Sequence, residues 1–138
     1  MQGKTFIDSN ILIYAFDDSD ERKRKMANQV LSDLWSQDAG TLSVQVLQEF
    51  YTNVTRKIRN PIAKPTAHRV VNHYSKWCGA TTAHEVQAAF RIESAALISF
   101  WDALIVACAQ NNGATRILSE DMQHGQVIAG IAIVNPFR

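Results

Sequence analysis

The hydrophobic pattern alternates between short apolar runs and longer stretches in which apolar residues recur every three or four positions. Short runs are typical of buried β-strands, and the longer spacing is typical of amphipathic helices. The runs predict strands over residues 5–8, 41–43, 116–119 and 131–134. The longer stretches predict helices over residues 10–16, 19–40, 44–58, 65–77, 82–98 and 101–112.

Residues that favour helix ends mark several of these boundaries. Ser19 precedes two acidic residues and is a candidate N-cap. Thr82, with Glu85 three residues later, matches a capping box. Asn60-Pro61 is expected to end one helix, and Gly113 another. These signals agree with the helices that the hydrophobic spacing predicts.

Alternating helices and short buried strands predict an α/β fold of three layers, in which a short parallel sheet is flanked by helices on both faces. The 138 residues, 46% of them hydrophobic, suffice for one core, and we expect a single domain over residues 1–138. Polar residues interrupt the apolar stretches well before the roughly 20 residues that a membrane span needs. With the first strand beginning almost at Met1, we expect a soluble, cytoplasmic protein.

Four carboxylates lie in or beside apolar stretches, where an unpaired charge is costly. Asp8 and Asp121 follow predicted strands, while Asp102 and Glu49 lie in the first and second turns of predicted helices. Because ligands of parallel sheets bind beyond the carboxyl ends of the strands, the four could converge there. Oxygen ligands favour Mg²⁺ or Mn²⁺, and such a cluster could hold one ion or two.

Each of these acids also has a simpler explanation. Asp8 could be only an N-cap, and Asp102 could be only the capping-box partner of Ser99. Asp121 could initiate a turn. Glu49 projects nearly opposite the apolar face of its helix, where a solvated glutamate is ordinary.

The formal net charge is only +1, but 11 of the 14 Lys and Arg residues fall in the first 78 positions. Two groups of them are candidates for contacts with nucleic-acid phosphates, although a solvated helix face is the ordinary role of such charges. The candidates are Arg22, Lys23, Arg24, Lys25, Arg56, Lys57 and Arg59. The cysteines and histidines match no zinc-ligand spacing.

Four blocks around the acids resemble, in order, the conserved blocks of PIN-domain proteins, specifically VapC-type toxins. The tail Ile133-Val134-Asn135-Pro136-Phe137 resembles that group as well, so that the likeness spans essentially the whole chain. The blocks are Asp8-Ser9-Asn10-Ile11-Leu12, Leu47-Gln48-Glu49-Phe50-Tyr51, Ser99-Phe100-Trp101-Asp102-Ala103-Leu104-Ile105 and Leu118-Ser119-Glu120-Asp121-Met122-Gln123-His124-Gly125.

The resemblance implies a PIN-like fold and an endoribonuclease that depends on Mg²⁺ or Mn²⁺. It further implies the toxin of a VapBC-type toxin–antitoxin pair, which is inhibited by a cognate antitoxin and is often a homodimer. Position by position, Asp8, Glu49, Asp102 and Asp121 match the catalytic and metal-binding acids of the family. Asn10 and Ser119 match groups that support those ligands, and Glu120 adds a fifth carboxylate, for which an exposed position is expected.

Other classes of protein also place an aspartate after a first buried strand. A haloacid-type phosphatase requires a second acid where this chain has Asn10. Both that class and receiver domains require a late lysine, whereas the last lysine here is Lys76. The remaining alternative is a catalytically silent PIN-like module that binds RNA or protein.

Overall fold

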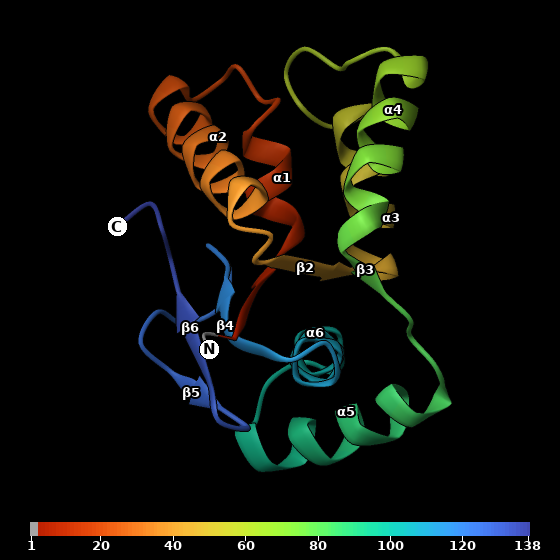
Figure 1. The fold of residues 1–138 in the computed structure, drawn as a ribbon, viewed down its shortest axis with the longest axis vertical. Coiled ribbons are helices and arrows are strands. Elements are labelled where there is room, and N and C mark those ends of the chain that lie inside the picture. Colours follow the sequence, from red (N-terminus) through yellow and green to blue (C-terminus); the bar gives the residue numbers. More distant parts are fainter. Residues whose placement is uncertain (1–2) are drawn as a thin grey trace.

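The computed structural model describes residues 3–138, in which strands and helices alternate (Figure 1). The strands are β1 (Lys4–Ile7), β2 (Gly40–Ser43), β3 (Cys78–Gly79), β4 (Ala114–Leu118), β5 (Val127–Ile128) and β6 (Ile131–Val134). The α-helices are α1 (Ser9–Tyr14), α2 (Glu21–Ser36), α3 (Val44–Val54), α4 (Lys64–Tyr74), α5 (Ala83–Ala96) and α6 (Phe100–Asn111). A short 3₁₀ turn, η1 (Ser75–Trp77), follows α4.

The strands form one sheet in the order β3-β2-β1-β4-β6-β5. β1 pairs in parallel with both β2 and β4, and β4 pairs in parallel with β6. Only β5 runs antiparallel, against β6. The chain therefore winds outward from β1 to β3 and then returns to the other side of β1, which creates a switch point between β1 and β4. In sheets of this kind, ligands bind beyond the strand ends at that point.

Helices cover both faces of the sheet, as the sequence predicts: α1 to α4 lie on one side, and α5 and α6 on the other (Figure 1). The buried apolar side chains form one continuous core. In α6 every residue from Ala103 to Ala109 is buried, which agrees with its apolar composition on all sides. The packed sheet and α6 thus support the loops at the carboxyl ends of the strands.

Two of the four predicted helix-end signals are confirmed, those at Thr82 and Gly113, whereas Ser19 is not the cap of α2 and α3 ends before Asn60-Pro61. Thr82 and Glu85 form the expected capping box, with the Thr82 amide donating to Glu85 Oε1 at 2.7 Å. Gly113 follows α6 with φ of +78°, the left-handed conformation that glycine adopts without strain. The cap of α2 is Asp20, one residue after Ser19, because its carboxylate accepts the Lys23 amide at 3.0 Å.

Four features depart from the sequence prediction. α2 ends at Ser36 instead of near Gly40, which begins β2. α3 ends at Val54 instead of Ile58, because the chain then curls around the Asn53 carbonyl, which accepts three successive backbone amides. α4 ends at Tyr74, and η1 completes the stretch to Trp77. β3 and β5 were not predicted, since strands of two residues carry no recognisable periodicity.

No single helix within residues 3–138 is long and apolar enough to cross a membrane. α5 and α6 reach the required length and composition only as a pair that is bent by 118°.

Candidate functional site

The four carboxylates singled out in the sequence come from four different elements that meet at the switch point. Asp8 follows β1, and Asp121 lies in the loop after β4. Glu49 and Asp102 lie in the first two turns of α3 and α6. Charge repulsion links all four: Glu49 and Asp121 raise the pKa of Asp8, Asp102 and Asp121 raise that of Glu49, and Asp121 raises that of Asp102. The four acids therefore form one electrostatically coupled cluster.

Asp8 is the most buried of the four, with 6% of its surface exposed. Its Oδ1 accepts the Ser9 amide at 2.8 Å, and its Oδ2 accepts the Ser119 hydroxyl at 2.7 Å. Burial raises the pKa of Asp8 to about 6, although these two hydrogen bonds lower it and the nearby acids raise it further. Asp8 does cap α1, as the simpler explanation holds, but that role does not account for its interaction with Ser119.

Asn10 and Ser119 connect the first and last acids. The Asn10 amide group donates to Asp121 Oδ2 at 3.1 Å and to Asp8 Oδ2 at 3.4 Å. Its oxygen accepts the Glu120 backbone amide at 3.1 Å. The Ser119 hydroxyl accepts the Asp121 backbone amide at 3.2 Å while it donates to Asp8. These bonds fix the loop after β4 against the start of α1.

Glu49 and Asp102 are half-buried, and burial is the main reason that both of their pKa values are raised. Side-chain hydrogen bonds from Gln45 and Ser9 partly offset this for Glu49, and one from Ser99 does so for Asp102. Ser99 also caps α6, because its hydroxyl accepts the Asp102 amide at 3.1 Å.

The solvated position considered for Glu49 is wrong. The buried face of α3 runs through Val46, Phe50 and Val54, so Glu49 falls at the edge of that face, where α1 packs. Ser9 at the start of α1 is close enough to hydrogen-bond to its carboxylate. Glu49 is therefore half-buried at a helix contact, which the spacing of apolar residues in α3 alone does not reveal.

The donor set consists of carboxylate oxygens with hydroxyl and amide neighbours, the chemistry that suits Mg²⁺ or Mn²⁺. Even so, no three His, Cys, Asp or Glu side chains between Gly3 and Arg138 are arranged to hold a metal ion. The two findings are compatible, because charge repulsion acts over distances well beyond the roughly 2 Å of a metal–oxygen bond. The acids fit the cation by chemistry, but their side chains do not form a coordination shell.

A cleft of about 410 Å³ opens beside Asp121. Asn10 and Asp121 line one side, and Asn53, Lys57 and Arg59 line another part. The cleft therefore connects Asp121 to one of the two basic groups identified in the sequence. Arg59 also contacts Asp18, with 3.6 Å between its guanidinium and the carboxylate, and Arg56 is exposed.

In the basic group on α2, three of the four side chains bind other groups of the protein. Lys23 pairs with Glu120. Arg24 donates two hydrogen bonds to Glu21, at 2.7 and 2.9 Å. Arg22 donates to the Phe137 carbonyl at 2.6 Å. Lys25 is exposed.

The exposed position expected for Glu120 is also wrong, since its carboxylate is half-buried. It accepts a hydrogen bond of 2.6 Å from the Tyr14 hydroxyl in addition to pairing with Lys23. Those partners lie 106 and 97 residues away in the sequence. No local pattern could have identified them.

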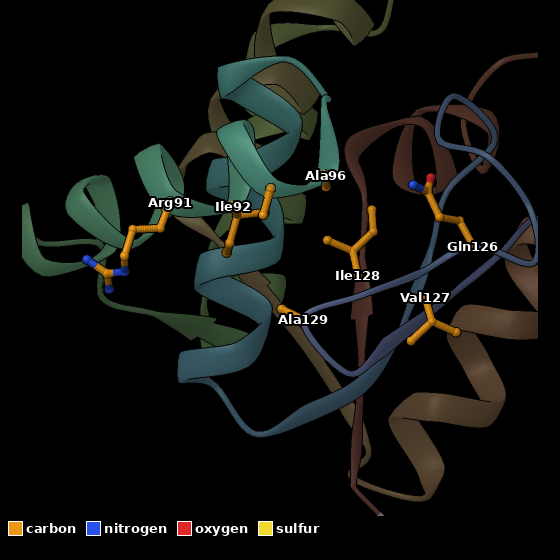
Figure 2. A pocket seen from close by; sticks show the side chains of 8 residues that line it. Arg91, Ile92, Ala96, Gln126, Val127, Ile128 and Ala129 are labelled. Carbon is orange, nitrogen blue, oxygen red and sulfur yellow. The ribbon is translucent and has the colours of Figure 1, made fainter.

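A second cavity, of about 540 Å³, lies between α5 and the β5–β6 hairpin (Figure 2). Ile92 and Ala96 of α5 line it, together with Val127, Ile128 and Ala129. Its lining is mainly apolar and includes none of the four acids. This cavity is therefore separate from the acidic cluster.

Comparisons with known proteins agree with this fold. A family model described as the PIN domain matches residues 5–128. A search of curated protein sequences finds no match. Similar solved structures include a toxin–antitoxin complex from Klebsiella pneumoniae, with 18% identity, a TM-score of 0.69, and coverage of 96% of this chain and 98% of that one.

Two further structures resemble the chain. DNA-bound VapBC from Salmonella typhimurium has 17% identity and a TM-score of 0.64, with 96% of this chain and 97% of that one covered. VapC20 from Mycobacterium tuberculosis, a sarcin-ricin loop cleaving toxin, has 19% identity and a TM-score of 0.61, with 86% and 90% covered. At these identities the likeness is one of fold.

Proposed function

Because this chain belongs to the PIN domain family, we propose that it is a divalent-metal-dependent endoribonuclease and the toxin of a VapBC-type toxin–antitoxin pair. The observation that carries the proposal is the meeting of four carboxylates from distant positions at the switch point of the sheet. A cluster of like charges, with Asp8 nearly buried, is destabilising without a compensating cation. Clusters of this kind persist where they have a function.

Asp8, Glu49, Asp102 and Asp121 are the residues that would hold Mg²⁺ or Mn²⁺. A bound ion of this type lowers the pKa of water and stabilises the charge that develops on a phosphoryl group during in-line attack. Asn10 and Ser119 orient Asp8 and Asp121 through the hydrogen bonds described above. Glu49 and Asp102 complete the acidic set from the opposite side.

The cleft beside Asp121 is the path we propose for the RNA strand. Lys57 and Arg59 line it and carry the positive charge that backbone phosphates require. Arg56 and Lys25 are exposed and offer further contacts, whereas Arg22, Lys23 and Arg24 are engaged within the protein. We expect KM for RNA to rise with salt, and to rise less steeply in the Lys57→Met variant.

We propose a cognate antitoxin as the protein partner and a homodimer as the assembly, both acting in the cytoplasm. The toxin–antitoxin complexes among the similar structures support the antitoxin. Exposed apolar side chains on α5, on α6 and in the link between them, namely Phe90, Trp101 and Leu97, support an association surface. Copurification from the native host tests the antitoxin, and light scattering coupled to gel filtration tests the dimer.

An RNA cleavage assay tests the activity. We expect cleavage with added Mg²⁺ or Mn²⁺, none with EDTA, and a loss of at least about 100-fold in Asp102→Asn. Asp38→Asn is the matched control, since Asp38 is exposed and its positive φ suits asparagine. Cleavage that survives EDTA, or an Asp102→Asn rate equal to that of the wild type, contradicts the proposal. RNA binding without cleavage supports the silent PIN-like module instead.

A further inference from the structure

Glu120 directly precedes Asp121, yet its carboxylate is bound to different partners from those of the acidic cluster. The Tyr14 hydroxyl donates to Glu120 Oε1 at 2.6 Å, and the Lys23 ammonium pairs with Oε2. The Lys23 and Glu120 side chains are only 24% and 23% exposed. The fifth carboxylate is thus neutralised by a lysine from α2.

The C-terminal tail completes this contact. The Lys23 ammonium lies 4.8 Å from the ring centroid of Tyr14 and 5.6 Å from that of Phe137, and the two rings meet edge to face at 5.1 Å. Phe137 is buried, and its carbonyl accepts a hydrogen bond from Arg22. Helices α1 and α2, the loop after β4 and the tail therefore meet around one ion pair, in a position that favours cation–π attraction.

Asn10 holds the backbone of the loop after β4, independently of the Glu120 side chain. Asn10 accepts the Glu120 amide, and it also donates to the Asp121 carboxylate. Asp121 is exposed and is repelled by three other acids, so an unrestrained loop would move it away from them. Restraint through the Glu120 side chain opposes that movement.

We propose that the Lys23–Glu120 pair, closed by Tyr14 and Phe137, is a clasp that positions Asp121 in the site. Lys23 is then a positioning residue and not an RNA contact, and Glu120 is not a fifth metal ligand. The kinetic part of the test rests on the nuclease function proposed above. The structural part does not depend on that function.

The structural part measures amide hydrogen exchange of Glu120 and Asp121. In Lys23→Met and in Glu120→Gln, we expect exchange at these amides to rise about tenfold, with no further rise in the double variant, because both changes open the same clasp. Lys23→Arg, which keeps the charge, should restore most of the protection. Lys4→Met and Glu21→Gln are matched controls, since Lys4 is exposed at the opposite end of β1 and Glu21 belongs to an exposed pair.

The kinetic part separates positioning from RNA contact. The clasp predicts that Lys23→Met and Glu120→Gln both lower kcat about tenfold, because both changes release Asp121. A phosphate contact predicts a higher KM and a shallower salt dependence for Lys23→Met alone. That second result, with unchanged amide exchange, overturns the clasp.

Two further outcomes are also decisive. If the wild type cleaves no RNA, the nuclease proposal fails and the amide exchange alone decides the clasp, with unchanged exchange in both variants overturning it. If Lys23→Met does not fold, Glu120→Gln carries the same comparison, because it removes a charge and preserves the size of the side chain.

Discussion

The two halves of the acidic cluster are held in different ways. In the inner half, Asp8 and Asp121 are joined by hydrogen bonds through Asn10 and Ser119. In the outer half, Glu49 and Asp102 lie on separate helices, and burial and repulsion raise the pKa of both. The fold therefore organises the inner half directly. It brings the outer half near by helix placement, and the proposed cation would offset the remaining repulsion.

The largest effect should come from the buried acid of the inner half. The rise in the pKa of Asp8 from 3.8 to about 6 corresponds to about 3 kcal/mol of folding free energy. Asp8 is neutral in both states below pH 3.8 and charged in both above pH 6, so the metal-free protein should lose this stability as pH rises between those values. Urea unfolding across this range should show a larger loss in the wild type than in Asp8→Asn, which keeps Glu49 and Asp102 with their raised pKa values. A difference in unfolding free energy between the two proteins that does not change with pH contradicts the raised pKa of Asp8.

Removal of the Asn10 side chain, which bridges Asp8 and Asp121, should have the next largest effect. Asn10→Ala leaves the Glu120 amide without its acceptor and frees the Asp121 carboxylate. We expect unfolding free energy to fall by about 1–2 kcal/mol and cleavage to fall about tenfold. Asn111→Ala, at the exposed end of α6, is the control. Equal stability and activity in the two variants would show that the inner half does not need this bridge.

The smallest effect should come from the outer half. Glu49→Gln removes a half-buried charge, so without metal the unfolding free energy should rise, by less than about 1 kcal/mol because solvent screens the carboxyl. With saturating Mn²⁺ the wild type should be more stable than Glu49→Gln, because it then gains binding energy that the variant lacks. Thermal unfolding with and without Mn²⁺ measures both signs. If Glu49→Gln remains the more stable protein with Mn²⁺, Glu49 is not part of the metal site.

The fold was largely predictable because its long elements carry strong periodicity and clear end signals. The helices from α2 to α6 and the strands β1, β2, β4 and β6 all correspond to predicted segments. β3 and β5 exist only through pairing with neighbouring strands. The early end of α3 depends on hydrogen bonds to one backbone carbonyl, which composition does not encode.

The site was predictable to different degrees for its different members. Asp8 and Asp121 follow from the rule that ligands bind beyond the ends of parallel strands. The helical spacing of α3 argues against Glu49, since its burial depends on the packing of α1 against α3. The partners of Glu120 come from distant parts of the chain and required the three-dimensional structure.

Calorimetric titration of Mn²⁺ into the metal-free protein at pH 7 tests most directly whether the four acids form one site. We predict that the wild type binds Mn²⁺ and that Asp8→Asn, Glu49→Gln, Asp102→Asn and Asp121→Asn each weaken binding at least about tenfold, while Asp38→Asn does not. No binding by the wild type, or binding of wild-type strength in both Glu49→Gln and Asp102→Asn, would contradict a shared site.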